Sequence, residues 1–228
     1  MTWRLLVFDW DGTLMDSAGH IVAAVQAAAA DIGASVPPEE GVRHVIGLGL
    51  REAIAAAMPE LGNDDYARFV AAYRQRFWQE SLHGQMLFPG AREVLLELKA
   101  TGYLLAVATG KGRSGLKRVL EEEMLHQVFD VTRCAEETIS KPDPRMLKEI
   151  LDELDLDSSD ALMIGDTSYD LEMASRAGMD RLGVSYGAHR KELLLPYAPL
   201  GILDDIRELP AWLAGADRAA TGKTGRSG

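Results

Sequence analysis

Four short apolar runs constrain the fold of this chain more than any other feature. They occupy residues 5–8, 104–108, 161–164 and 182–185, and stretches with helical periodicity lie between them. Apolar runs of this length are typical of strands that are buried on both faces. Two weaker strand signals lie at residues 128–134 and 202–203. We therefore predict a Rossmann-like parallel α/β sheet with helices on both faces.

Helix boundaries can also be predicted from individual residues. Pro89 and Gly90 precede a helix that we expect to end near residue 100. Pro144 suits the first turn of a later helix, with Asp143 as its cap. A third helix, expected from residue 169 to 177, ends at Gly178. These boundaries place helices between the predicted strands, as a parallel sheet requires.

One long stretch interrupts the alternation of strands and helices. Residues 17–86 contain no convincing strand, and helical periodicity covers residues 20–32, 50–58 and 64–82. A block of this length is too long for a simple crossover between two strands. We expect it to form a small helical cap domain inserted after the first strand.

The rest of the chain then divides into a core and a tail. Residues 1–16 and 87–214 are expected to form the Rossmann-like core around the sheet. Residues 215–228 lack apolar periodicity and consist of Gly, Ala, Thr and charged residues with few others, so we expect a disordered tail there.

Charge and composition exclude several classes of function. The chain has 228 residues, with 35 Asp and Glu against 24 Lys and Arg, which gives a formal net charge of −11. This acidity argues against a general nucleic-acid binder. No apolar run approaches the roughly 20 residues of a membrane-spanning helix, and the apolar run near the start is too short for a signal peptide. With Cys134 as its single cysteine, the chain suits a reducing compartment, so we expect a cytoplasmic protein without membrane partners.

The first polar segment, Asp9-Trp10-Asp11-Gly12-Thr13, follows the first predicted strand. Two carboxylates two residues apart point the same way in an extended chain. Such a pair is costly unless a cation or a shared proton compensates the charge. Gly12 would permit a sharp turn after the pair. The alternative is an ordinary solvated loop, since Asp and Gly are common loop residues.

Two further segments carry groups that suit a phosphate. Thr109 and Gly110 follow the second strong strand, where a hydroxyl and a backbone amide at a helix start can hold a phosphate oxygen. Lys141 is followed by two prolines that restrict the backbone and hold its direction. The alternatives are a capping threonine and a surface lysine.

The fourth segment, residues 165–170, adds two carboxylates. Asp166 and Asp170 are four residues apart, so both can face one site from a loop and a first helical turn, although helix capping is the alternative. Because parallel strands end at one edge of the sheet, all four segments can converge. Mg²⁺ prefers oxygen ligands and lysine binds phosphate as a point charge, so the set suits phosphoryl transfer.

In this order and spacing, the four segments resemble the four motifs of the haloacid dehalogenase-type (HAD) superfamily. The helical insert is similar to the cap of its phosphoglycolate phosphatase-like branch. The resemblance covers about residues 3–214, including Pro89-Gly90 and residues 183–187. It implies that Asp9 is a nucleophile and that Asp11 protonates the leaving alcohol and then activates water.

The resemblance also implies binding roles. Thr109 and Lys141 match residues that hold the phosphoryl oxygens, and we place Gly12, Thr13 and Gly110 around the same phosphate. Many relatives carry Asn where Gly110 stands, which leaves only the backbone amide as a donor there. The resemblance assigns a Mg²⁺ ion to four residues: Asp9, the backbone carbonyl of Asp11, Asp166 and Asp170.

The predicted cap contributes candidates for substrate recognition. In relatives, the part of the cap that matches residues 45–51 holds a specificity loop. Arg43, His44 and Arg51 are therefore candidates for contacting a second anionic group of the substrate. The alternative is that these side chains are solvated surface residues.

Together these features predict a Mg²⁺-dependent phosphatase that acts on a small phosphorylated metabolite, with phosphoglycolate as the leading candidate. A sugar phosphomutase of the same family is the main alternative. A haloacid dehalogenase is less consistent with Asp11, Asp166 and Asp170, and a phospho-Asp receiver protein would lack the cap. Whether the protein is a monomer or a dimer is left open by the sequence.

Overall fold

A parallel sheet of six strands forms the centre of the molecule. The computed structural model describes residues 2–81 and 87–224. The strand order is β3-β2-β1-β4-β5-β6, and every neighbouring pair is parallel. The strands are β1 (Leu5–Phe8), β2 (Leu104–Thr109), β3 (Val131–Cys134), β4 (Ala161–Gly165), β5 (Asp180–Val184) and β6 (Ile202–Leu203). All six predicted strands are therefore confirmed, and the order is that of a Rossmann-like fold.

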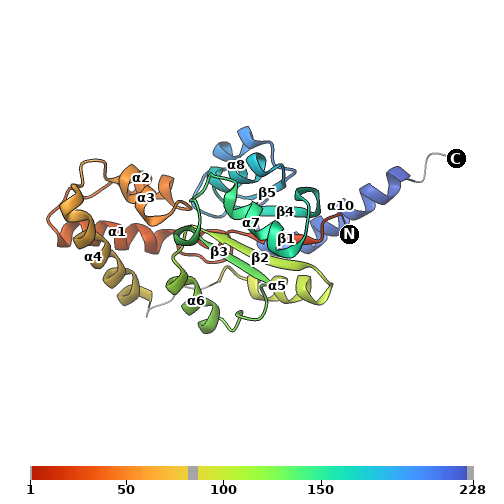
Figure 1. Ribbon diagram of the computed structural model, residues 1–228, viewed down its shortest axis with the longest axis horizontal. Coiled ribbons are helices and arrows are strands. Elements are labelled where there is room, and N and C mark those ends of the chain that lie inside the picture. Colours follow the sequence, from red (N-terminus) through yellow and green to blue (C-terminus); the bar gives the residue numbers. More distant parts are fainter. Residues whose placement is uncertain (1, 82–86, 225–228) are drawn as a thin grey trace.

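Helices cover both faces of this sheet (Figure 1). Three pack on one face, namely α5 (Ala91–Ala100), α6 (Arg113–Glu122) and α10 (Leu209–Thr224). Two pack on the other, namely α7 (Arg145–Leu154) and α8 (Ser168–Ala177). A short helix, α9 (Lys191–Leu194), follows β5.

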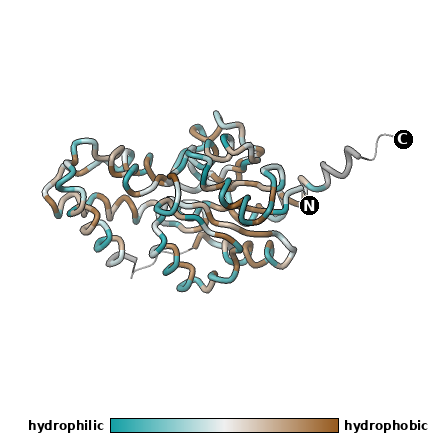
Figure 2. Tube along the Cα trace, viewed as in Figure 1, coloured by the Kyte–Doolittle hydropathy of each residue, from teal (hydrophilic) through white to brown (hydrophobic). Residues whose placement is uncertain are grey.

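Strand β1 shows why short apolar runs form the middle of such a sheet. Leu6 and Phe8 pack into the cluster beneath α5 and α6, while Leu5 and Val7 pack into the cluster beneath α7 and α8. All four side chains are fully buried. The central strands are accordingly among the most hydrophobic parts of the trace (Figure 2). A strand buried on both faces needs apolar residues at every position, which explains the uninterrupted run.

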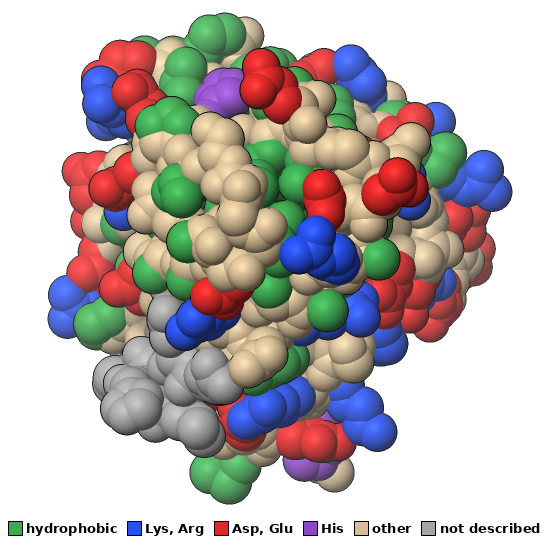
Figure 3. All heavy atoms as spheres, turned by 90° about the vertical axis from the view of Figure 1, so that its left-hand side faces the viewer, with side chains coloured by type: hydrophobic (Ala, Val, Ile, Leu, Met, Phe, Trp, Pro, Cys, Tyr) green, Lys and Arg blue, Asp and Glu red, His purple; other side chains and the backbone are tan. Residues whose placement is uncertain are grey.

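Four helices between β1 and α5 form a separate helical cap, defined here as residues 18–81. They are α1 (Ala18–Asp31), α2 (Glu39–Val45), α3 (Leu50–Ala57) and α4 (Asn63–Ser81). They enclose a cluster of their own that contains Val25, Ile54 and the fully buried Phe69. The cap forms the left-hand end of the molecule in Figure 1, and on the face seen in Figure 3 acidic and basic side chains are interspersed.

Two features differ from the sequence-based expectation. Helix α2 was not predicted, because seven residues are too few for a clear helical period. The expectation of a disordered tail is wrong as far as Thr224, because α10 continues through residues 215–224. Its first turns are anchored by Leu209 and Leu213 in the core and by stacking of Trp212 on Trp3 at 5.6 Å, and alanines then favour continuation of the helix.

The predicted domain division stays a prediction, and its boundary at residue 86 lies outside the described residues, as do residues 225–228. Within the described part of the chain, no helix is both long and apolar enough to cross a membrane.

Candidate active site

Strand β1 places Asp9 at the centre of the carboxyl edge of the sheet. Its neighbours are β2 on one side and β4 on the other. Thr109 is the last residue of β2, and Asp166 directly follows β4. The backbone amide of Asp9 continues the β1–β4 pairing by donating to the Ile164 carbonyl at 3.0 Å. The topology therefore brings segments that are a hundred or more residues apart to one edge, as predicted from the strand ends.

A buried lysine links two of the predicted acidic residues. The Nζ atom of Lys141 lies 2.7 Å from Asp9 Oδ1 and 2.6 Å from Asp170 Oδ1. All three side chains are almost completely inaccessible to solvent. Burial alone would lower the pKa of Lys141, but the carboxylates of Asp170 and Asp9 outweigh it and hold the pKa above its ordinary value. The lysine is therefore a fixed positive charge at the centre of the site.

The carboxylate of Asp166 is held by a loop on each side. Thr13 Oγ1 donates to its Oδ1 at 2.7 Å, and the amide of Ala188 donates to its Oδ2 at 2.7 Å. A Cβ atom on Gly12 would lie only 2.2 Å from Asp166 Oδ2. Thr13 and Gly12, which we predicted to surround the phosphate, thus contact Asp166 in this structure. Burial, with a contribution from Asp170, raises the pKa of Asp166 to about 7.

The same region forms a cluster that fits a metal ion. Carboxylate oxygens of Asp9, Asp166 and Asp170 all lie within 4.8 Å of one another. The three carboxylates carry three formal negative charges and the Lys141 ammonium carries one positive charge. The buried group therefore has a formal excess of two negative charges. Burial is the largest cause that raises the pKa of Asp9, and its Oδ2 atom accepts no hydrogen bond from the described residues. A hard divalent cation such as Mg²⁺ suits this set of oxygen donors and would neutralise the excess.

The second carboxylate of the first segment, Asp11, points away from that cluster. Ser17 Oγ donates to Asp11 Oδ1 at 2.8 Å. Lys111 Nζ lies 3.0 Å from Oδ1 and 3.2 Å from Oδ2, and the Phe77 ring of the cap covers this ammonium, with its centroid 4.7 Å away. The two predicted catalytic carboxylates therefore have different environments. Lys111 and Ser17 were not predicted, although Lys111 directly follows Thr109 and Gly110, an adjacency that could have identified it.

Gly110 lies directly beneath the backbone of the cap. A Cβ atom at this position would lie 2.3 Å from the carbonyl oxygen of Leu48 and 2.7 Å from that of Gly47. The neighbouring Thr109 is buried, and its Oγ1 accepts a hydrogen bond from the Lys111 amide at 3.1 Å. The loop between α2 and α3 thus occupies the space that the side chain of an Asn would need.

Further contacts hold this loop and α2 on the core. The amide of Gly49 donates to Ser140 Oγ at 2.7 Å. Near the end of α2, the carbonyl of His44 accepts a hydrogen bond from the Tyr169 hydroxyl at 3.0 Å and lies 3.0 Å from His189 Nε2. Because the Ser168 amide donates to His189 Nδ1 at 3.1 Å, the neutral Nε2–H tautomer satisfies both contacts. The cap is therefore closed over the carboxyl edge of the sheet.

The three residues predicted to contact substrate from the cap lie in different places. Arg51 lines the pocket described below, with its guanidinium 4.9 Å from the ring centroid of Tyr66. His44 stacks on His189 at 5.3 Å, to the side of the site. Arg43 pairs with Glu39 at 2.8 Å on the outside of α2 and does not reach the pocket.

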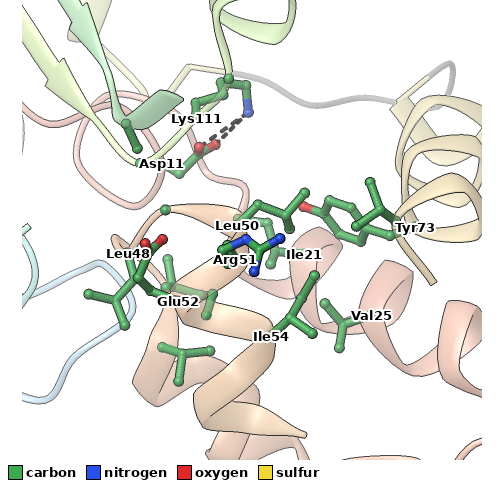
Figure 4. A pocket seen from close by; sticks show the side chains of 18 of the residues that line it. Asp11, Ile21, Val25, Leu48, Leu50, Arg51, Glu52, Ile54, Tyr73 and Lys111 are labelled. Carbon is green, nitrogen blue, oxygen red and sulfur yellow. Dashed lines mark hydrogen bonds and ion pairs between the residues drawn. The ribbon is translucent and has the colours of Figure 1, made fainter. Parts of the chain in front are cut away.

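Between cap and core lies a cavity of about 580 Å³, called the cap–core pocket here. Asp9, Asp11 and Thr109 lie at one end of it, and the remainder is lined by residues of all four cap helices, of the loop between α2 and α3, and of core segments that include Lys111 and Glu136. Figure 4 shows Lys111 and Asp11 paired on one side and Ile21, Val25, Ile54 and Tyr73 facing them from the cap. The pocket therefore connects the carboxylates to the interior of the cap.

Residues 6–184 match the model of the family described as "Haloacid dehalogenase-like hydrolase". The chain belongs to the haloacid dehalogenase-like hydrolases. Within this family it is similar to a probable phosphatase, IndB, of Dickeya dadantii, with 34% identity over 90% of this chain and 91% of that protein. It is also similar to a phosphoglycolate phosphatase of Vibrio cholerae, with 31% identity over 90% and 95% of the two chains.

The fold of this haloacid dehalogenase-like hydrolase is also found in solved structures. A protein described as a predicted phosphoglycolate phosphatase from Haemophilus somnus superposes with a TM-score of 0.83 at 26% identity, covering 93% of this chain and 99% of that one. The resemblance inferred from the four polar segments is thereby confirmed at the level of the family, together with the Rossmann-like fold.

Proposed function

We propose that this hydrolase is a Mg²⁺-dependent phosphatase that cleaves a phosphate monoester through an aspartyl-phosphate on Asp9. The observation that carries the proposal is the position of the Asp9 carboxylate. It is buried and faces the pocket, with Lys141 Nζ 2.7 Å from Oδ1, while Oδ2 accepts no hydrogen bond from the described residues. Relatives named phosphoglycolate phosphatase make phosphoglycolate the first substrate to test.

In the first half of the reaction, a carboxylate oxygen of Asp9 attacks the phosphorus atom. A bond between this oxygen and phosphorus forms as the bond between phosphorus and the leaving oxygen breaks. The Lys141 ammonium and the Thr109 hydroxyl, both buried at this edge, would stabilise charge on the phosphoryl oxygens. An ionised carboxylate needs no separate base to act as a nucleophile.

Asp11 is the group proposed to move protons. It would give a proton to the leaving oxygen and later take one from the water that hydrolyses the aspartyl-phosphate, so that alcohol, phosphate and free Asp9 are regenerated. Ser17 and Lys111 hold its side chain from two sides, which limits the orientations that it can adopt. Positioned proton transfer of this kind contributes typically 10²- to 10⁴-fold to a rate.

Asp9, Asp166 and Asp170 are the side chains that would hold the Mg²⁺ ion. When bound, the ion supplies positive charge that offsets the repulsion between Asp9 and an incoming phosphate. Thr13 and the Ala188 amide fix Asp166 for this role, and Lys141 fixes Asp170.

The nucleophile assignment is tested by Asp9→Asn, which keeps the size of the side chain. We expect turnover of p-nitrophenyl phosphate to fall at least about a thousandfold, while the circular dichroism spectrum stays that of the wild type. Asp16→Asn is the matched control, because Asp16 is exposed and outside the pocket, and it should retain full activity. Substantial activity in Asp9→Asn would contradict the assignment.

The metal is tested separately with the wild-type protein. EDTA should stop phosphate release, and excess Mg²⁺ should restore it. Full activity in EDTA after dialysis would show that the reaction needs no divalent ion. We further expect the substrate to be a small phosphorylated metabolite in the cytoplasm rather than a nucleic acid, in keeping with the net charge of −11.

A further inference from the structure

The cap–core pocket continues well beyond the catalytic carboxylates. Its far wall is built from apolar side chains of three cap helices, including Ile21 and Val25 of α1, Ile54 of α3 and Phe69 of α4. The Tyr73 side chain of α4 points its hydroxyl group into the same space (Figure 4). Charged residues such as Arg51, Glu52 and Arg74 also line the pocket, but these are exposed, whereas the buried part of the lining is mostly apolar. Apolar walls with a few polar groups are typical of sites that bind carbon-rich groups.

The size of the pocket exceeds what a two-carbon substrate needs. Phosphoglycolate has about nine non-hydrogen atoms and is much smaller than the drug-sized ligands that occupy pockets of ~300–1,000 Å³. The pocket measures about 580 Å³. A volume of this size is typical of pockets for drug-sized ligands, so a two-carbon substrate would leave much of the apolar wall uncovered.

The charges around Asp11 also disfavour a leaving group that is short and anionic. The carboxylate of phosphoglycolate would lie one carbon from the phosphate ester oxygen, next to Asp11. The cation that contacts Asp11 is Lys111, which is already paired with both of its oxygens and covered by the Phe77 ring, while the other cations of the lining, Arg51 and Arg74, are exposed. A leaving group without charge would leave that ion pair intact.

We propose that the cap–core pocket selects phosphate monoesters whose alcohol carries an uncharged, largely apolar ring or chain. This inference rests on the proposed phosphatase function and specifies its substrate class. The phosphate would lie at Asp9 and Thr109, and the ring would lie between α1, α3 and α4. Burial of the added carbon atoms lowers the free energy of the transition-state complex by excluding water from the apolar wall.

The direct test uses the wild-type protein and three primary phosphate esters of similar leaving-group chemistry. They are ethyl phosphate, butyl phosphate and 2-phenylethyl phosphate, with phosphoglycolate as the anionic comparison and release of inorganic phosphate as the readout. We expect kcat/KM to rise from ethyl to 2-phenylethyl phosphate by at least about tenfold, because a single buried methylene can contribute that factor. Phosphoglycolate should be poorer than 2-phenylethyl phosphate.

A pair of variants on α3 locates the effect. The helix begins next to Ser140 of the core, and Ala57, eight residues after Gly49, lines the pocket about 12 Å further along. Ala57→Phe should fill the far end and lower the ratio of kcat/KM for 2-phenylethyl over ethyl phosphate at least fivefold. Ala56→Phe is the matched control, because Ala56 is exposed on the same helix and does not line the pocket.

The outcomes separate this inference from the proposed function. Equal kcat/KM values across the alkyl series, or a preference of more than tenfold for phosphoglycolate, would overturn the inference and leave the phosphatase intact. Absence of turnover with every ester would instead refute the phosphatase proposal itself. If Ala57→Phe does not fold, the wild-type series alone still decides. An unchanged ratio in a folded Ala57→Phe protein would place the ring elsewhere and overturn the proposal.

Discussion

The close approach of the cap loop to Gly110 allows a prediction whose size can be worked out from the structure. In Gly110→Ala, the new methyl carbon would lie 2.3 Å from the Leu48 carbonyl oxygen and 2.7 Å from that of Gly47. Both are backbone atoms and cannot rotate away as a side chain could. The loop must therefore retreat by roughly 1 Å to reach an ordinary van der Waals distance.

A retreat of this size would break the adjacent hydrogen bond to the core. The Gly49 amide lies 2.7 Å from Ser140 Oγ, so an added 1 Å exceeds hydrogen-bonding distance. Loss of such a bond costs about 1 kcal/mol, and overpacking adds ~1–3 kcal/mol if the loop stays in place. The closed cap should thus be destabilised by about 1–3 kcal/mol. This corresponds to a decrease of roughly 5- to 150-fold in the closed population relative to the open one.

We expect kcat/KM of Gly110→Ala for 2-phenylethyl phosphate to fall at least about fivefold. Amide hydrogen exchange at Gly49 should become faster by a similar factor, while the midpoint of thermal unfolding changes little. Gly115→Ala is the matched control, since a Cβ there is 3.4 Å from the nearest atom, an ordinary contact with the Lys111 side chain. A Gly110→Ala protein with wild-type kcat/KM and a protected Gly49 amide would refute the proposed role of this glycine.

Three further predictions concern the buried charges and the contacts of the cap. Lys141→Met leaves Asp9 and Asp170 buried without their cation, so urea unfolding at pH 8 in EDTA should show a loss of about 3–5 kcal/mol. The pKa of Asp166 is about 7 in the folded protein, whereas the ordinary pKa of an Asp carboxyl group is 3.8. Between these two pH values, the folded state therefore keeps a proton on Asp166 that the unfolded state has released. Without metal, the unfolding free energy should therefore fall as pH rises from about 4 to 7, by up to about 4 kcal/mol, and thermal unfolding with Mg²⁺ should show a weaker dependence. His189→Ala removes the link between Ser168 and the His44 carbonyl and should lower kcat/KM several-fold, whereas the exposed His126→Ala should not.

Much of the fold could be predicted because its determinants are local. The predicted run at residues 5–8 coincides with β1, and the run at 161–164 falls one residue short of the end of β4. Strands buried on both faces require uninterrupted apolar residues, so their positions can be read from the sequence. The helical tail was not predicted, because its anchoring depends on Trp212 stacking on Trp3, a contact between the two ends of the chain.

The candidate site was predictable only where strand ends determine it. Asp9, Thr109 and Asp166 come together because β1, β2 and β4 are neighbours in the sheet. In contrast, the role of Thr13 depends on the loop that contains Asp166, which is far away in the sequence. The cap contacts are equally non-local, since neither local periodicity nor composition can indicate that Leu48 covers Gly110.

Thr109 at the end of β2 and the two residues that follow it connect chemistry to cap closure, and each does so differently. Thr109 lines the cap–core pocket beside Asp9 and is proposed to bind the phosphate, Gly110 leaves room for the backbone of the cap loop, and Lys111 reaches both Asp11 and the Phe77 ring of the cap. An open cap would remove Phe77 from Lys111 and expose this ion pair to water, which weakens it. The orientation of the proposed proton donor, Asp11, is therefore coupled to closure by the same short segment that is proposed to contact the phosphate. The cap would thus close fully, and complete the catalytic arrangement, only when the leaving group fits beneath it. The apolar pocket would therefore affect kcat as well as substrate binding.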